Sequence, residues 1–236
     1  MPIETRRRTN PSNPSLCAVI FLILIPAIGH SQASDELTLG DRLAHEYEEQ
    51  AGLGHTPELE SISSYISSVG NRVAKALPAS PQYHFIFDPN PAFKSAFALP
   101  GRYIIVGGGL LALTQTEDEL ANALAHEIEH VDLGQVSRRE AELTKHEDVK
   151  NLKVSEFFPG YTKQDELDCD LNGQKLAAKA GYSPAGMLTL LETFKALSKG
   201  QPEPFSKDHP TLSERLAQAE PLANASDQKQ VALRIP

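Results

Sequence analysis

The chain has 236 residues, the size of one domain with modest extras, so it can bury a hydrophobic core of its own. Hydrophobic residues make up 40% and charged residues 22%, as expected of a soluble globular protein. The formal net charge of −9 argues against nucleic acid or an anionic membrane surface as the main partner.

The first 33 residues have the layout of a secretory signal peptide. Three arginines at 6–8 precede an almost wholly apolar run from Leu16 to Ile28, and the small residues Ser31 and Ala33 stand at the −3 and −1 positions of a cleavage site. We therefore expect cleavage after Ala33, leaving residues 34–236 as a single domain. The apolar run is short for a membrane-spanning helix of about 20 residues. The alternative is an uncleaved leader that anchors the chain in the inner membrane.

Cleavage would leave one cysteine, Cys169, in the exported chain. An exported protein with one thiol has no intramolecular disulfide, so its stability has to come from its core. No later run is long and apolar enough for a second membrane segment.

The first half of the remaining chain predicts two helices followed by strands. A helix is expected at residues 35–54, and a second at 59–77, where apolar residues recur three and four apart. Three short strands are then expected at residues 83–87, 95–99 and 103–106. The turn at Pro100-Gly101 predicts that the last two strands form a hairpin.

Helices dominate the second half. Thr116 and Glu119 match a capping box, so a helix should begin near Glu117 and bury residues such as Leu120, Leu124 and Ile128. Further helices are expected at residues 164–180, 185–197 and 211–219, with loops at 146–163 and 200–209 and a frayed tail after about residue 221.

The run His126-Glu127-Ile128-Glu129-His130 lies on the helix that begins near Glu117. Residues four apart share one face of a helix, so the two imidazoles can point at a single ion such as zinc. Glu127 lies beside the first histidine and can act as a general base on a water whose pKa the metal lowers. The alternative is a charged helix with two surface histidines. Because the motif lies in an apolar stretch, we favour the metal site.

A catalytic zinc has three protein ligands and an open position. A glycine three residues after His130 and a histidine three further on would supply a third histidine, but Leu133 and Val136 stand there. The third ligand is then a glutamate; the candidates are Glu140, Glu142, Glu147, Glu156 and Glu166.

We choose Glu166. We expect Glu140 and Glu142 to lie too far along the helix of the histidines, and Glu147 and Glu156 to lie in a loop. Glu166 opens its own helix, and Asp170, four residues on, could accept the second ring N–H of a ligand histidine. The alternative is a solvated acidic helix start.

These features resemble metallopeptidase family 48, which includes HtpX-like and CAAX-prenyl endopeptidases and periplasmic zinc metalloproteases of the BepA and LoiP type. The resemblance runs from about Leu59 to Leu216. It rests on the shared order of residues 95–101, 103–111, 126–130, 163–173 and 180–184, followed by His209-Pro210 and Arg215.

The resemblance implies an α+β zincin-like (gluzincin) fold, mostly helical, with a small sheet and an exposed edge strand. It implies one Zn²⁺ per chain on His126, His130 and Glu166, with Glu127 as base. Asp170 would support a ligand histidine, and Arg215 would anchor an acidic group. The edge strand, to which a substrate peptide could add as a further strand, would be Ala96, Phe97, Ala98 and Leu99. For His209 two roles stay open: a group that approaches the zinc, or a surface histidine.

The chain departs from the family's pattern at four places. Cys169 replaces the usual alanine, Ser95 an asparagine and Lys163 an arginine. Cys169 is expected to be a small buried residue. Glu129 is an additional acid that we expect to be solvated or paired.

The residues thus predict a metalloendopeptidase. The resemblance and the export signal add unfolded or misassembled proteins of the bacterial envelope as substrates, a periplasmic location, and possible peripheral association with the membrane or the outer-membrane assembly machinery. The rival is a non-catalytic metal-binding chaperone or binding module, against which Glu127 argues.

Overall fold

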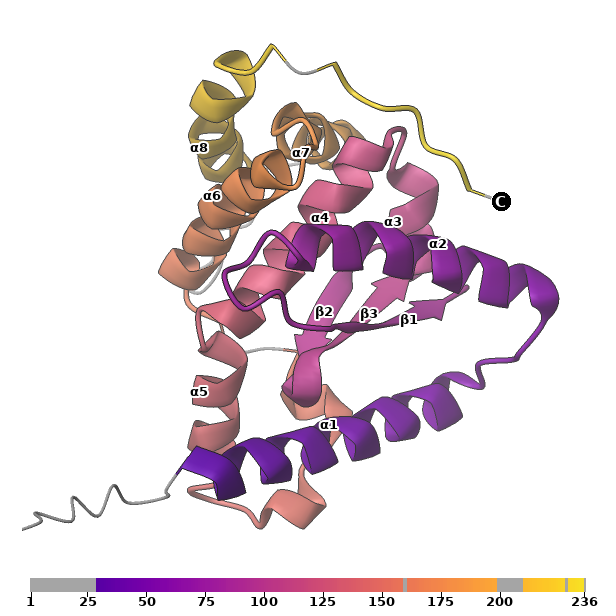
Figure 1. Ribbon diagram of the computed structural model, residues 1–236, viewed down its shortest axis with the longest axis vertical. Helices are drawn as coiled ribbons and strands as arrows, with labels where there is room; N and C mark the ends of the chain where they lie inside the picture. Colours follow the sequence, from indigo (N-terminus) through magenta and orange to yellow (C-terminus); the bar gives the residue numbers. More distant parts are fainter. Residues whose placement is uncertain (1–28, 159–160, 199–209, 228, 236) are drawn as a thin grey trace, which may run out of the picture.

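A computed structural model describes residues 29–158, 161–198, 210–227 and 229–235. It is mostly helical with one small sheet (Figure 1), which confirms the predicted α+β class. Its helices and strands are α1 (Gly29–Ala51), α2 (Pro57–Ala74), β1 (His84–Asp88), β2 (Ala96–Leu99), β3 (Tyr103–Gly107), α3 (Gly108–Leu113), α4 (Glu117–Asp132), α5 (Gln135–Leu143), α6 (Lys163–Lys179), α7 (Ala185–Leu197) and α8 (Leu212–Asn224). Short 3-10 turns lie at Pro100–Arg102, Val149–Asn151 and Val154–Glu156.

The sheet is mixed and has the order β1-β3-β2. β1 runs parallel to the central strand β3, and β2 runs antiparallel to it, with Ala96 opposite Val106. The turn between β2 and β3 confirms the predicted hairpin, and Gly101 adopts the φ of 72° that favours glycine. Within the described residues only β3 pairs with β2, so β2 is an edge strand.

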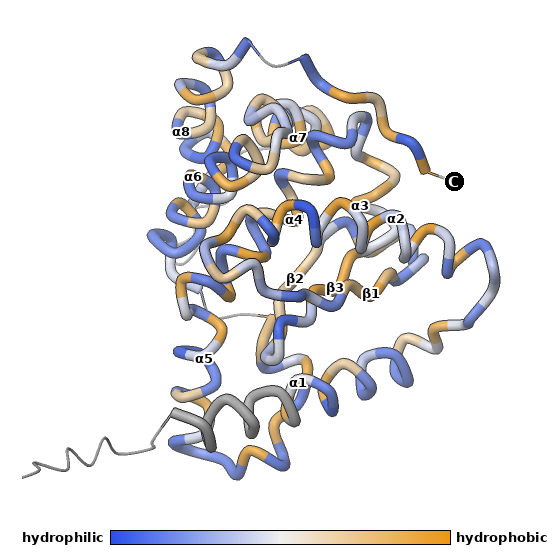
Figure 2. Tube along the Cα trace, in the orientation of Figure 1, coloured by the Kyte–Doolittle hydropathy of each residue, from blue (hydrophilic) through white to orange (hydrophobic). Residues whose placement is uncertain are grey.

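The two faces of the sheet pack on different helices, α2 and α4 on one side and α1 on the other (Figure 1). Along β3 the side chains alternate, because Ile104 and Val106 face the first core and Ile105 faces the second. In Figure 2 the strands are largely orange, and the coloured part of α1 alternates between blue and orange, as a helix with one buried face does.

Helix α4 runs through the middle of the molecule. Every residue from Asp118 to His130 is buried, because α2, the sheet, α6 and α7 all pack around it. The expected inward residues Leu120, Leu124 and Ile128 are fully buried. Thr116 caps the helix by accepting a hydrogen bond from the backbone of Glu119. A helix enclosed on all sides holds its side chains firmly, which suits a site that needs fixed geometry.

Helix α4 begins at Glu117 as expected, but several other local predictions were wrong in detail. Glu119 does not complete a capping box with Thr116, because its carboxylate instead accepts hydrogen bonds from Gln115 N and the Thr189 hydroxyl. The stretch directly after β3, for which the sequence predicted no helix, forms α3. Helix α8 continues past Pro221 to Asn224.

The tail after residue 221, expected to fray, packs back on the start of α4. The backbone of Glu117 donates to the carbonyl of Val231, and Thr116 forms a β-bridge with Ala232. The unsatisfied N–H groups at the start of α4 therefore gain a partner from the end of the chain.

Residues 1–28 of the expected signal peptide lie outside the described residues, as does the expected loop at 200–209. Helix α1 begins before the expected cleavage point after Ala33, and cleavage there stays a prediction. Of the helices described, none combines the length and the apolar character needed to cross a membrane.

Gly186 sets how closely α7 approaches α4. A Cβ added there would lie 2.4 Å from the backbone oxygen of Asp118. Alanine improves helix propensity by roughly 0.5–1 kcal/mol, but the clash is with backbone and should outweigh that gain. We expect Gly186→Ala to lower the free energy of unfolding by about 1–3 kcal/mol in urea denaturation.

The matched control for this change is Gly54→Ala, because nothing lies within 4 Å of a Cβ at Gly54 and its φ is not positive. That variant should be near neutral or slightly stabilised. Equal stability of the two variants would contradict the close packing of α7 on α4.

Candidate metal centre

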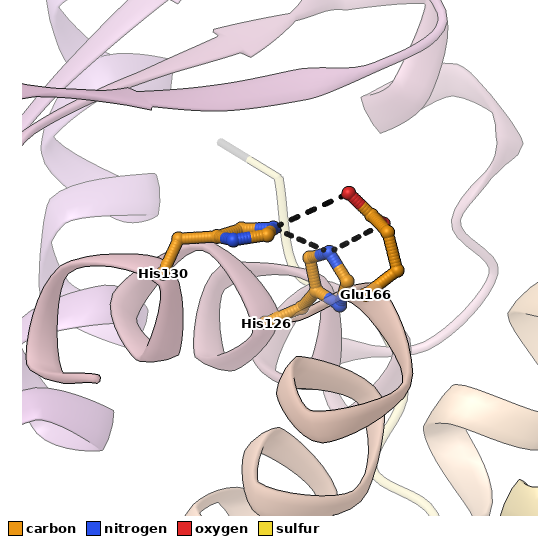
Figure 3. Close-up of side chains that lie close together, drawn as sticks. All are labelled: His126, His130 and Glu166. Carbon is orange, nitrogen blue, oxygen red and sulfur yellow. Dashed lines mark hydrogen bonds and ion pairs between the residues drawn. The ribbon is translucent and has the colours of Figure 1, made fainter. Parts of the chain in front are cut away.

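The two histidines of α4 project from one face of the helix, one turn apart, and are buried (Figure 3). Their Nε2 atoms lie 3.0 Å apart, and their rings are nearly perpendicular at 82°. Two ring nitrogens this close need either a shared proton or a cation between them.

Glu166 approaches the same point from the first turn of α6 (Figure 3). Its carboxylate oxygens lie 3.5 Å from Nε2 of His126 and 3.8 Å from Nε2 of His130. A capping box between Thr162 and Asp165 fixes where α6 begins, so Glu166 falls on the turn facing α4. The structure thus brings together the three residues that the sequence singled out as ligands.

Close packing of α6 on α4 makes this convergence possible. A Cβ added at Gly173 would lie 3.0 Å from the backbone nitrogen of His126, so a side chain there would push the two helices apart. Glycine at this position lets Glu166 and Asp170 reach His126.

The three donors fit a zinc ion. One ligand atom from each residue lies within 4.8 Å of the others. Tetrahedral zinc with bonds of about 2.0–2.2 Å needs ligand atoms roughly 3.3 Å apart. The observed separations of 3.0, 3.5 and 3.8 Å bracket that value. Two imidazoles and one carboxylate also leave the fourth position open.

The outer nitrogen of His126 is held by Asp170. Its Nδ1 lies 2.9 Å from a carboxylate oxygen of Asp170, and Arg215 from α8 binds both oxygens of that carboxylate at 2.6 and 2.7 Å. Asp170 is fully buried. An Nδ1–H that donates to Asp170 leaves the lone pair of Nε2 facing Glu166.

The outer nitrogen of His130 is held by Gln135, a residue that the sequence analysis missed. Nδ1 of His130 lies 2.6 Å from the amide oxygen of Gln135, which is 3% exposed. Gly134, with a φ of 70°, ends α4 and turns the chain so that Gln135 points back at the histidine. The sequence signal that could have identified Gln135 was a glycine followed by an amide residue shortly after His130.

Burial and charge set the protonation of the cluster in the absence of a metal. Burial lowers the pKa of His126, but its bonds to Asp170 and Glu166 outweigh this and raise the pKa to about 10. Burial and the neighbouring His126 lower the pKa of His130 to about 4. Burial opposes ionisation of Glu166, yet the two histidines lower its pKa to about 2. A metal ion bound here would therefore take the place of a proton between these groups.

Glu127 lies in the same cleft, next to His126. Burial is the main reason why its pKa is raised to about 7, Glu166 adds to the rise, and the backbone of Ala98 on β2 opposes it. A carboxyl group that titrates near neutrality can both take and return a proton.

The cleft, of about 420 Å³, is bounded on one side by the edge strand. Ala96 and Phe97 line it, whereas Ala98 and Leu99 are buried. Phe158 packs edge-on against Phe97, and Tyr161 stacks on the ring of His130 with centroids 3.9 Å apart. These aromatic rings form one wall of the cleft.

The sequence analysis placed two of the rejected ligand candidates on the wrong helix. Glu140 and Glu142 were expected on the helix of the histidines, but they lie on α5, because α4 ends at Asp132. Glu147 and Glu156 lie in the segment between α5 and α6, as expected, although that segment contains two 3-10 turns.

The other residues that the sequence analysis noted lie in different environments. Cys169 is buried, with Sγ 3.4 Å from Nδ1 of His130, on the side away from Glu166. Glu129, expected to be solvated or paired, is instead 6% exposed, and no ion pair among the described residues involves it. Lys163 pairs with Glu214, and Ser95 is exposed at the cleft. His209 lies outside the described residues.

Comparisons with known proteins find similarity to peptidases. The model of the peptidase family M48 matches residues 60–146, which include both histidines. A beta-barrel assembly-enhancing protease of Escherichia coli is 27% identical over 85% of this chain and 47% of its own length. The metalloprotease LoiP of E. coli is 23% identical over 75% of this chain and 76% of its own. The mitochondrial metalloendopeptidase OMA1 of Schizosaccharomyces pombe is 27% identical over 70% and 54%.

Over residues 60–146 the chain is therefore similar to peptidase family M48, and the three relatives are named as a protease, a metalloprotease and a metalloendopeptidase. It spans about half the length of the beta-barrel assembly-enhancing proteases that it matches.

Gln135 should raise metal affinity, because it fixes the tautomer of His130. We expect Gln135→Leu to weaken zinc binding by roughly 10- to 100-fold in competition with a chromophoric chelator. Gln164→Leu, an equal change at an exposed position of α6, is the control and should bind zinc like the wild type. Equal affinities in the two variants would show that Gln135 does not orient His130.

Arg215 should stabilise the fold through Asp170. Removing it in Arg215→Met takes the guanidinium from the buried carboxylate, leaves His126 as its remaining partner, and should cost about 3–5 kcal/mol in urea unfolding of the metal-free protein at pH 7. The ion pair between Arg138 and Asp165 is exposed on the arginine side. Arg138→Met should therefore cost less than about 1 kcal/mol.

The pH dependence of this effect has a definite sign. Burial alone would raise the pKa of Asp170, but Arg215 and His126 hold it well below its usual range. A carboxyl with a lowered pKa in the folded state stabilises the fold above its unfolded pKa of about 3.9, and this stability is lost as the pH falls below that value. Arg215→Met should therefore unfold at a higher pH than the wild type during acid titration, and coincident acid transitions would contradict the role of the pair.

Proposed function

We propose that this protein is a zinc-dependent endopeptidase that binds one Zn²⁺ per chain on His126, His130 and Glu166. The observation that carries the proposal is the convergence of these three side chains beside Glu127, in a cleft bounded by the edge strand β2. Mixed nitrogen and oxygen donors with an open fourth position are typical of catalytic zinc. The match of residues 60–146 to a peptidase family supports the reaction class.

Bound zinc would supply a Lewis acid that polarises a peptide carbonyl and lowers the pKa of water. Glu127 would accept the proton that the attacking water loses and return it to the leaving amine. Asp170 and Gln135 would keep both histidines in the tautomer that presents Nε2 to the ion, and Arg215 would hold Asp170 in place.

The edge strand would position the substrate. The outer backbone edge of β2 is unpaired by any other described strand, so an extended peptide could add to it. Ala96 and Phe97 line the cleft, and the small side chain of Ala96 lets a peptide approach. In this proposal the backbone of Ala98 also lowers the pKa of Glu127, so the edge strand influences the protonation of the base.

His209 remains a proposed additional group at the metal, as a ligand or a donor to the reacting carbonyl. It precedes α8, whose Arg215 reaches into the site and whose first turn is capped by Thr211. The bond from Arg215 to Asp170 links the first turns of α8 to the cluster, and this supports the proposal.

We further propose unfolded or misassembled proteins of the bacterial envelope as substrates. The similarity to a protease named for enhancing beta-barrel assembly supports a substrate class of this kind, and the predicted signal peptide supports a periplasmic location. Peripheral association with the membrane or with the outer-membrane assembly machinery belongs to the same proposal. N-terminal sequencing of the exported protein would distinguish cleavage after Ala33 from an uncleaved leader that anchors the chain.

The test of catalysis is the substitution Glu127→Gln, which keeps size and removes the base. We expect zinc-loaded wild type to cleave casein and Glu127→Gln to lose at least about 100-fold of that rate. Metal analysis should still find one zinc per chain in Glu127→Gln and far less in His126→Ala. Glu192→Gln, at an exposed position on α7, should cleave like the wild type.

The rival, a non-catalytic metal-binding chaperone, makes the opposite prediction. Zinc-loaded wild type would then leave casein intact, and Glu127→Gln would keep the cellular phenotype of the wild type. That pair of results would reject the endopeptidase.

A further inference from the structure

The outer edge of β1 borders a second groove in the molecule. β1 is the edge strand opposite β2, and among the described residues only β3 pairs with it. The groove has a volume of about 440 Å³, within the roughly 300–1,000 Å³ that is usual for binding pockets. None of the described residues that line it also lines the metal cleft. A ligand bound here would therefore leave the metal cleft free.

Helices α1 and α2 form the two walls of this groove. Figure 1 shows α2 on one side of β1 and α1 on the other. Phe85 and Phe87 pack in the first core, to which α2 contributes, whereas Ile86 packs against the second core, to which α1 contributes. Gln82 and His84 line the groove and are exposed. The edge of β1 is therefore the floor of a groove that a ligand can enter from solvent.

Asn71 on α2 already takes the position of a neighbouring strand at one residue. Its side-chain amide accepts a hydrogen bond from the backbone N–H of Tyr83 at 3.1 Å and donates one to the carbonyl of Tyr83 at 3.3 Å. Backbone groups of alternate residues point to the same edge of a strand, so those of Phe85 and Phe87 follow Tyr83 along the outer edge. Outside the ladder with β3, no hydrogen bond among the described residues involves the backbone of Phe85 or Phe87. A peptide backbone that continues the pattern begun by Asn71 would satisfy these groups.

The charge of the groove suits a basic ligand. Asp41 and Glu48 of α1 line it, and among the described lining residues there is no lysine or arginine. Asp41 accepts a hydrogen bond from the hydroxyl of Tyr103 at 2.6 Å, whereas no hydrogen bond or ion pair among the described residues involves the side chain of Glu48. Side chains of an added strand would alternate between the two walls. A basic residue at every second position would therefore face Glu48, and the residues between would face Ser67 and Asn71 of α2.

We propose that the outer edge of β1 binds an extended, basic segment of a partner protein, which adds to the sheet as a further strand. A second copy of this chain fits less well, because pairing two β1 edges would bring the carboxylates of Asp41 and Glu48 from both copies together. The site holds the partner at the edge of the sheet opposite the metal cleft. It therefore goes beyond the proposed peptidase function and does not depend on it.

The first measurement is the binding of short peptides to the full chain. Zinc-loaded Glu127→Gln is used, so that the peptide stays intact, and fluorescence anisotropy gives the affinity. The probe is a fluorescein-labelled peptide in which lysine and valine alternate, and the control peptide has glutamate in place of lysine. We expect the lysine peptide to bind at least about 10-fold more tightly than the glutamate peptide. Equal affinity for the two peptides would overturn the proposal.

The backbone contacts have a probe of their own. Along an extended peptide the N–H groups of alternate residues point to opposite edges. Methylating the nitrogens that face β1 removes hydrogen bonds to the strand, whereas methylating the others does not. The lysine peptide methylated at its lysine nitrogens and the same peptide methylated at its valine nitrogens should therefore differ at least about 10-fold in affinity. If the two methylated peptides bind equally, strand addition is wrong.

Two substitutions tie the binding to the groove. Glu48→Lys reverses the free carboxylate of α1 and should weaken binding of the lysine peptide at least about 10-fold. Its control is Glu192→Lys, the same change at an exposed position of α7. Ser67→Arg adds a positive charge from the α2 wall and should also weaken binding. Its control is Ser64→Arg, at an exposed position of α2 outside the groove. Thermal unfolding is measured for each variant, so that misfolding of one leaves the other to decide.

Amide hydrogen exchange locates the bound peptide. The lysine peptide should slow exchange at Phe85 and Phe87, whose N–H groups face the groove. Slowed exchange at Phe97 on β2 alone, with unchanged affinity in both folded groove variants, would place the peptide at the metal cleft and overturn the proposal. A dimer of the peptide-free protein with slowed exchange at Phe85 and Phe87 would assign the edge to a second copy and overturn it as well. Casein cleavage by the wild type tests the peptidase separately, so either proposal can fail without the other.

Discussion

The site depends on the close crossing of α4 and α6. The two histidines come from α4, and the carboxylates that face them come from α6. The distances between these groups therefore depend on how the two helices cross. Gly173 allows the backbones to approach, and His126 then reaches both Glu166 and Asp170. Arg215 joins α8 to the same point through Asp170. A small displacement of α6 would separate the donors and expose a buried charge at once, which links stability to metal binding.

When no metal is bound, two effects oppose each other in the buried groups around the histidines. Burial disfavours every charged form, yet a network of opposite charges keeps Glu166 and Asp170 ionised. The result is a cluster that holds a proton on His126 and is prepared for a cation. Glu127 lies outside this pairing, and burial leaves its pKa near neutrality, where it can exchange a proton.

The sheet contributes by position. Its edge strand and α4 together bound the cleft, and side chains of α7 also line it. Since β2 pairs on one side with β3, its other edge is the natural place for an extended chain. The same packing that forms the first core, with α4 between the sheet and α7, therefore also places backbone, base and apolar side chains around one cavity.

Local signals determined much of this protein. The spacing of His126 and His130 on a helix, the hairpin turn at Pro100-Gly101 and the apolar period of α2 follow from interactions a few residues apart, and each could be predicted from the chain alone. Only the tertiary structure decided which carboxylate faces the histidines, that Gln135 rather than a carboxylate holds His130, that Glu129 is buried, and that the tail returns to the start of α4. These features join residues that lie far apart in sequence or beyond a helix end, and periodicity carries no information about contacts between helices.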